Sequence, residues 1–293
     1  MQLHKRKAYL GLTVAGVLLG STLFMVVEAE AASPASNGQV SGHVISQSKH
    51  FTKGSTASKK TLVKKKSYDS KNEVQKLSNI IALTRKKVAQ EKSVSVKIGA
   101  SFAINKGAIL EHSNGNITEI SGELQDTIVI GKKTGHLNQI LSHKVAYCKG
   151  NVVGLEYGCG LTAAQADKAT NKWVAIPDTK QNSSLYKSSA GDMTIGAAFA
   201  SLFPSSLTSY HLAKNIYINK INAYSIVGTV PGSISSTLPK GISEEFYVAA
   251  NGSYLPLRVQ LTTKGVGELV DFSNWGKAQA PGQPQQSVNI NKL

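Results

Sequence analysis

The stretch that decides the fold reads Val94-Ser95-Val96-Lys97-Ile98-Gly99-Ala100-Ser101-Phe102-Ala103-Ile104. Apolar residues stand at every second position, and small or polar residues stand between them. Because successive side chains of a strand point to opposite faces, this alternation predicts a β-strand with one buried and one exposed face. A strand of this kind needs neighbouring strands and a cover for its apolar face.

Strand-like runs continue on both sides of the middle of the chain. They are predicted at 108–112, 117–124, 127–131, 144–149, 151–155, 172–176, 221–230, 245–250, 254–263 and 267–272. Turn residues separate many of them, as in Asn105-Lys106-Gly107, Ser113-Asn114-Gly115-Asn116 and Lys133-Thr134-Gly135. Asn251-Gly252 is the strongest hairpin signal in the chain. The short spacing predicts an antiparallel meander, not alternating strands and helices.

Four segments have the apolar spacing of helices. The first, Glu73 to Glu91, has apolar residues on one side and Lys76, Arg85, Lys86 and Lys87 mostly on the other. Such a helix either covers a core or lies on a membrane surface, and the first interpretation is favoured. Shorter helices are expected at Leu161–Lys168, at Asp192–Leu202 with Asp192 as N-cap, and around Ser206–Ala213.

The first 31 residues have the order of a secretory signal. The basic run His4-Lys5-Arg6-Lys7 precedes a mostly apolar segment that ends at Ala29-Glu30-Ala31. This pattern predicts export and cleavage after Ala31, with an uncleaved anchor helix as the alternative. Ser21 stands where a lipoprotein signal would need its lipidated cysteine, so lipid attachment is not expected there.

The positive charge is concentrated in one part of the chain. Residues 32 to 92 contain thirteen Lys and Arg against three acids, whereas residues 93 to 293 contain seventeen against twelve. Residues 32–72 have little apolar periodicity and are expected to form a disordered tether, which is either attracted to anionic membrane or wall surfaces or is only a solvated spacer. Residues 73–278 are expected to form one domain, followed by a disordered tail at 279–293.

Cys148 and Cys159 are the two cysteines of the chain. In an oxidising compartment, a pair at this short separation predicts a disulfide, with two free buried thiols as the alternative. Two cysteines are too few for a metal site. The histidines show no ligand spacing, and no nucleophile or phosphate-binding motif is present. We therefore expect no enzyme activity, metal, cofactor or nucleic-acid partner.

The order of elements, together with three groups of residues, resembles a known superfamily. These residues are Gly160-Leu161-Thr162-Ala163-Ala164-Gln165-Ala166 with Asn171-Lys172-Trp173-Val174-Ala175-Ile176-Pro177, Tyr254-Leu255-Pro256-Leu257-Arg258-Val259, and Asp271-Phe272-Ser273-Asn274-Trp275-Gly276. They resemble the bacterial envelope lipoprotein carriers that include LolA, LolB, LppX and LprG. The resemblance covers about residues 73–278 and departs from the lipoprotein members in the missing cysteine.

This resemblance implies an α+β fold, a half-open β-barrel in which helices cover the concave face of a strongly curved antiparallel sheet. It also implies a monomer with an apolar cavity for a lipid or another apolar molecule. The candidate lining residues are Val96, Ile98, Phe102, Ile104, Phe199, Leu202 and Phe203. The alternative is a secreted scaffold protein in which the same residues make a filled core.

Overall fold

The computed structural model describes residues 70–104, 107–191, 193–202, 209–230, 242–263 and 266–293. The expected signal segment, nearly all of the expected tether, Asp192 and Phe203 lie outside these residues. No helix within the described ranges is both long enough and apolar enough to span a membrane.

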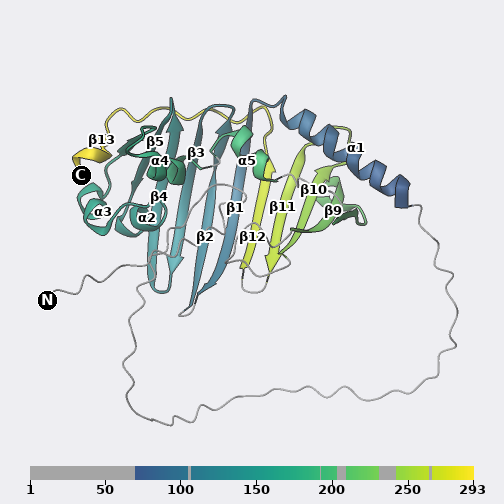
Figure 1. Ribbon diagram of the computed structural model, residues 1–293, viewed down its shortest axis with the longest axis horizontal. Coiled ribbons are helices and arrows are strands. Elements are labelled where there is room, and N and C mark those ends of the chain that lie inside the picture. Colours follow the sequence, from purple (N-terminus) through teal and green to yellow (C-terminus); the bar gives the residue numbers. More distant parts are fainter. Residues whose placement is uncertain (1–69, 105–106, 192, 203–208, 231–241, 264–265) are drawn as a thin grey trace, which may run out of the picture.

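One 13-stranded sheet forms the body of the protein (Figure 1). Its spatial order is β13-β6-β5-β4-β3-β2-β1-β12-β11-β10-β9-β7, and β8 also pairs with β9. The first six strands are β1 (Ser93–Ile104), β2 (Gly107–Thr118), β3 (Gly122–Ile130), β4 (Lys133–Ser142), β5 (Val145–Gly150) and β6 (Val174–Pro177). The others are β7 (Tyr210–Leu212), β8 (Ile216–Ile218), β9 (Ile221–Val230), β10 (Ile242–Ala249), β11 (Pro256–Thr263), β12 (Val266–Ser273) and β13 (Val288–Asn289).

The sheet consists of two meanders that meet at a single junction between β1 and β12. Strands β1 to β6 follow one another in space, and strands β9 to β12 do the same. At the junction the two strands are antiparallel, with Val96 opposite Phe272 and Ile98 opposite Val270. The described strands do not close into a barrel, because β13 and β7 are the two ends of the path. The expected curved, half-open sheet is therefore confirmed, and its strand pairings are antiparallel except for that of β13 with β6.

Five α-helices accompany the sheet within the described part of the chain. They are α1 (Ser70–Val88), α2 (Val152–Tyr157), α3 (Ala163–Ala169), α4 (Ser183–Ala190) and α5 (Ile195–Leu202). Helices α2 and α4 pack on strands β3 to β6, whereas α1 contacts β7 near the other end of the sheet. Figure 1 shows α2, α4 and α5 in front of the same face of the sheet. Helix α1 begins at Ser70, inside the segment expected to be part of the tether.

We call the helix-bearing side of the sheet the covered face. In β1 it carries Val94, Val96, Ile98 and Ala100, all buried, whereas the residues between them are polar or small. Four side chains of α1 are buried in the same apolar core: Leu77, Ile80, Ile81 and Val88. The alternation that predicted β1 thus correctly identified its buried side, and the amphipathic α1 covers a core as expected.

Several expectations about local structure are wrong. The turn expected at Lys133-Thr134-Gly135 is the start of β4, and the strand expected at 117–124 is interrupted by the turn between β2 and β3. Residues 151–155 were expected to form a strand but belong largely to α2, whose N-cap Asn151 accepts a hydrogen bond from the Gly154 backbone. Ser113–Asn116 lies inside β2 instead of forming a turn. The helix expected around Ser206–Ala213 is replaced, in its described part, by strand β7. Local side-chain bonds and pairing with neighbouring strands outweigh intrinsic preference at these places.

The C-terminal segment contradicts the expected disordered tail. Strand β13 pairs in parallel with β6, and Ile290 is buried in the main core. Gln283 donates a hydrogen bond of 2.7 Å to the Tyr147 hydroxyl, and Lys168 donates one to the backbone of Leu293. A few apolar residues and an available sheet edge therefore order a segment whose composition is mostly polar.

Candidate functional site

An open cleft of about 510 Å³ lies where α1 ends, α5 begins and the turn joins β2 to β3. Its walls are Arg85, Val88, Ala89, Glu91, Glu119, Ile195, Gly196 and Phe199. This volume falls within the range of about 300–1,000 Å³ that is usual for small-molecule sites. The cleft is the candidate entrance for a ligand.

Aromatic side chains connect the wall of the cleft to the sheet. The ring of Phe199 on α5 lies 4.9 Å from the ring of Phe272 on β12 and 5.4 Å from that of Trp275. The Trp275 indole donates a hydrogen bond to the backbone oxygen of Pro256. Tilted contacts of this kind stabilise by about 0.5–1.5 kcal/mol each beyond their burial. They fix α5 over the β1–β12 junction.

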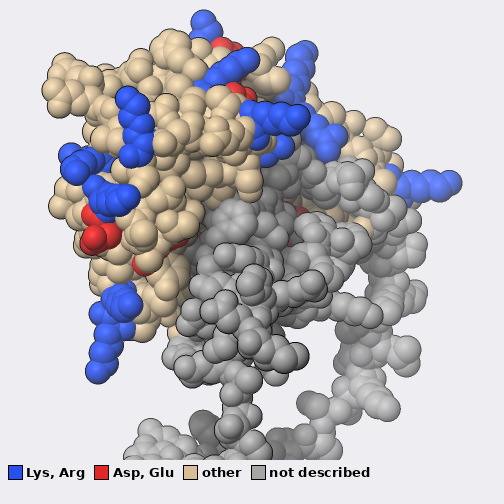
Figure 2. Space-filling view, turned by 60° about the vertical axis from the view of Figure 1, so that its left-hand side comes forward, with Lys and Arg blue, Asp and Glu red and all other residues tan. Residues whose placement is uncertain are grey.

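Charged groups surround the apolar part of the cleft. Glu91 and Glu119 are carboxylates of the wall, and Arg85 begins the basic last turn of α1 with Lys86 and Lys87. Figure 2 shows one face of the molecule, on which Lys and Arg side chains are more numerous than Asp and Glu. This face is thus predominantly basic.

The structure separates the residues predicted to line a cavity. Phe199 is a wall residue of the cleft, whereas Val96 and Ile98 are buried on the covered face and are not part of its walls. Phe102 and Ile104 belong to β1, and Leu202 ends α5. The side chains of these three residues lie outside the described part, as does all of Phe203. Ligand contact by this set stays a prediction.

Buried carboxyl groups interrupt the apolar covered face. Glu111 on β2 and Asp126 on β3 are 5% and 7% exposed, respectively. Ser113, which is directly opposite Asp126, donates a hydrogen bond of 3.3 Å to Glu111. Burial raises the pKa of Glu111 to about 7, with a further contribution from the charge of Asp126. Burial raises the pKa of Asp126 to about 6. The charge of Asp126 thus adds to burial in destabilising the ionised form of Glu111.

A third carboxyl on the covered face has a partner within the protein. The Tyr210 hydroxyl on β7 donates a hydrogen bond to Glu244 on β10. Gly228 of β9 lies between them, and a Cβ atom there would be 2.1 Å from the tyrosine ring. Burial raises the pKa of Glu244 to about 7. A glycine is therefore required for Tyr210 to reach across β9.

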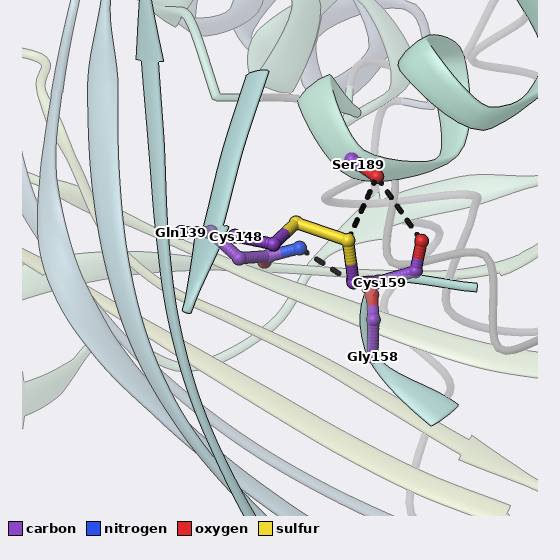
Figure 3. The surroundings of a disulfide bond; sticks show 5 residues. All are labelled: Gln139, Cys148, Gly158, Cys159 and Ser189. Carbon is purple, nitrogen blue, oxygen red and sulfur yellow. Dashed lines mark hydrogen bonds between the residues drawn. A yellow bond between two sulfur atoms is a disulfide. The ribbon is translucent and has the colours of Figure 1, made fainter. Parts of the chain in front are cut away.

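The predicted disulfide between Cys148 and Cys159 is confirmed. It links β5 to the segment that follows α2, and both residues are fully buried (Figure 3). Ser189 of α4 donates a hydrogen bond of 3.2 Å to the backbone oxygen of Cys159, and Gln139 of β4 donates one to that of Gly158. The bridge therefore holds α2 and α4 against the same part of the sheet.

Within the residues that the structure describes, no group of three or more His, Cys, Asp or Glu side chains could hold a metal ion. Sequence reasoning missed most cleft residues and both carboxyls on β2 and β3. The carboxyls had a signal, because Glu111 and Ser113 follow Ile109 at period two and so share its buried face. The cleft had no such signal in the sequence, since the end of α1 and the start of α5 are far apart along the chain.

No family model matches the chain, and no curated protein sequence matches it. Among solved structures, the fold is similar to that of the lipoprotein LppX of Mycobacterium tuberculosis, with 11% identity over 70% of this chain and 97% of LppX and a TM-score of 0.44. LprF of Mycobacterium bovis gives 13% identity, coverage of 71% and 97%, and a TM-score of 0.42. An uncharacterized conserved protein of Thermus thermophilus is 10% identical over 73% of this chain and 99% of its own length, with a TM-score of 0.36. LppX is one of the proteins that the resemblance in the sequence names.

Proposed function

We propose that this chain is an extracytoplasmic envelope protein that binds or carries a lipid or another apolar ligand between its curved sheet and helices, without catalysing a reaction. The observation that carries this proposal is the open cleft beside the apolar covered face. Phe199 belongs to both, because it lines the cleft and packs on Phe272 of the sheet. A hydrocarbon chain that entered between α1 and α5 would therefore meet apolar side chains first.

The amphipathic character of α1 and the short α5 supports the same proposal. Both helices contribute residues to the walls of the cleft: α1 gives Arg85 and Val88, and α5 gives Ile195, Gly196 and Phe199. Helix α1 contacts the sheet at β7, and its Lys76 ammonium lies over the ring of Tyr224 on β9. A modest displacement of α5 or of the end of α1 would enlarge the cleft without breaking the sheet.

The second candidate function is a secreted envelope interaction protein with a filled core. It is favoured by the close packing of Val96, Ile98, Val270 and Phe272 in one buried cluster. The two functions differ in whether apolar molecules enter the space between the sheet and the helices. Three further points remain predictions: cleavage after Ala31, attraction of residues 32–72 to anionic surfaces, and a monomeric state. N-terminal sequencing would test the cleavage, and sedimentation would test the monomeric state.

Gly196 offers a direct test of the cleft. It is a wall residue, and a Cβ atom built at this position meets no other atom within 4 Å. The substitution Gly196→Trp should therefore fill the cleft without disturbing the backbone. We expect an apolar fluorophore to bind the full exported chain at least about tenfold more weakly in this variant, a change of about 1.4 kcal/mol.

The matched control is Gly282→Trp. Gly282 is exposed in the C-terminal segment, and a Cβ atom there also meets nothing within 4 Å. This control should bind like the wild type. Native mass spectrometry of the wild-type protein from its own host should show a bound lipid. If no lipid accompanies the protein and the fluorophore does not bind, the scaffold function is the correct one.

A further inference from the structure

A row of carboxyl groups crosses the covered face at one level of the sheet. In the strand register, each residue of the row lies directly opposite the next, and all of them belong to the covered face. The row reads Glu111 (β2), Ala100 (β1), Glu268 (β12), Leu261 (β11), Glu244 (β10), Gly228 (β9) and Tyr210 (β7). Three glutamates thus alternate with apolar or small residues across the interior of the sheet.

The carboxyl groups at the two ends of this row differ in their hydrogen-bond partners. At the β7 end, Glu244 accepts the hydrogen bond from Tyr210. At the β2 end, Glu111 and Asp126 share the single hydroxyl of Ser113 as a neighbouring donor, and that hydroxyl bonds to Glu111. The Oδ1 atom of Asp126 is buried and has no hydrogen-bond partner. Buried polar atoms are nearly always paired, so an unpaired carboxylate oxygen suggests a missing partner.

The protein supplies no cation for this pair among its described side chains. The described ion pair of Arg258 joins it to Asp271 on the opposite face of the sheet. For Glu111, the charged neighbour that affects it is another acid, Asp126. Two neighbouring carboxyls in an apolar environment favour a partner that brings both positive charge and hydrogen-bond donors.

In the strand register, Glu111 lies at the level of Glu268 and Asp126 at the level of Ile98 and Val270, so both lie further along the sheet than Phe272. The aromatic contact of Phe272 with Phe199 marks the cleft end of β12, and Glu268 lies four residues further along the same strand. At about 3.3 Å per residue, this separation is about 13 Å for the level of Glu111 and about 7 Å for that of Asp126. Between the levels of Phe272 and Glu268, the covered face of the junction shows Ile98 and Val270. A molecule that spans both levels must be apolar along its length and polar at its inner end.

We infer that Glu111 and Asp126, with Ser113, form a binding site for the ammonium group of an amphiphilic ligand whose hydrocarbon part lies along the covered face toward the cleft. This inference rests on the proposed function, because it requires that an apolar chain enters. An ammonium group has three donors and one positive charge, which match the unpaired Oδ1 atom and the charge of the carboxyl pair. A neutral hydroxyl would satisfy one oxygen but would leave the charge uncompensated.

The net charge of the protein makes the inference easy to distinguish from surface attraction. The chain has a formal net charge of +16, so its surface repels cations and attracts anions. Any preference for an ammonium compound over a carboxylate of equal length therefore has to come from carboxyls along the path of the ligand. Besides the pair, these are Glu91 and Glu119 in the cleft wall and Glu268 and Glu244 in the row on the covered face.

The test uses the full exported chain with a bound apolar fluorophore and three competitors of equal length: dodecylammonium, dodecanol and dodecanoate. At about pH 7.5, we expect dodecylammonium to compete at least about tenfold better than dodecanol. The isosteric pair of substitutions Glu111→Gln and Asp126→Asn should abolish this preference and leave the dodecanol affinity within about twofold. These substitutions keep the side-chain shape, remove the charge and replace one acceptor oxygen by an NH2 donor.

The control variants are Glu91→Gln and Glu119→Gln in the cleft wall. Both should retain the preference, and its loss in either would place the ammonium site in the cleft and overturn the inference. Equal binding of the three competitors to wild-type protein would overturn the ammonium site but keep the proposed function. If the fluorophore itself does not bind, the proposed function fails first. Extraction of phosphatidylethanolamine from vesicles would support a lipid headgroup as the source of the ammonium, and binding of dodecylammonium without such extraction would support a free amine.

Discussion

The buried carboxyl pair should make the stability of the protein depend on pH in a direction opposite to that of ordinary surface acids. The perturbation is Glu111→Gln, which keeps the shape of the side chain and removes its ionisation. In the folded protein, burial and then the charge of Asp126 raise the pKa of Glu111 from 4.5 to about 7. In the unfolded chain the group regains its ordinary pKa.

The sign of the effect follows from proton binding. Between about pH 4.5 and pH 7 the folded state holds a proton on Glu111 that the unfolded state has released, so the free energy of unfolding falls as pH rises. The protonated form is fully stabilising below the unfolded pKa, and this contribution is lost as pH rises through the folded pKa. A rise of the pKa from 4.5 to about 7 corresponds to about 3 kcal/mol.

The assay is urea unfolding of the full exported chain at about pH 4.5 and about pH 8. We expect wild type and Glu111→Gln to have similar stability at the lower pH, and the variant to be more stable by up to about 3 kcal/mol at the higher pH. The control is Glu119→Gln, which changes an exposed residue of the turn between β2 and β3. Its free energy of unfolding should equal that of the wild type at both pH values. Parallel pH curves for Glu111→Gln and wild type would refute the claim that Glu111 is buried with a raised pKa.

Two further predictions concern segments far from the carboxyl pair. Replacing both Cys148 and Cys159 with Ala should lower the free energy of unfolding by about 3 kcal/mol, as measured by urea unfolding, because the bridge closes a loop of sequence separation 11; a loss under about 1 kcal/mol would contradict a stabilising role for the bridge. Ile290→Ala should cost about 2–4 kcal/mol in the same measurement, since Ile290 is buried in the main core. The control Gln285→Ala changes an exposed residue of the same segment, and equal effects of the two substitutions would show that the segment does not pack on the sheet.

Period two in residues 94–104 was sufficient to predict β1, because one face of that strand is buried throughout its described part. The same reasoning failed at Ser113–Asn116, where turn-forming residues occupy the middle of β2. A Cβ atom at Gly115 would be 1.8 Å from the backbone oxygen of Glu123, so glycine is required there by close strand approach. Asn116 accepts from Ser95 and donates to Glu123. These requirements come from strand pairing and are not visible in the local sequence.

The C-terminal segment shows the limit of composition as a guide. Its Pro, Gly, Gln and Asn residues predict disorder, yet Val288 and Ile290 are enough to attach it to β6 and the core. Whether such a segment is ordered depends on the unpaired edge of a strand more than 100 residues earlier in the chain. The candidate site has the same dependence, since its cleft unites residues of α1, the β2–β3 turn and α5.

The β1–β12 junction also has a consequence for how fast the protein reaches its native state. Each meander is made of neighbours in sequence and can form early, but the junction joins residues as distant as Ser95 and Asn274, which are 179 positions apart. Contacts of this range slow folding, because chain entropy is lost before they form. We expect refolding to be limited by the meeting of the two meanders, so that an alanine at Phe272 slows refolding whereas one within an outer hairpin mainly accelerates unfolding.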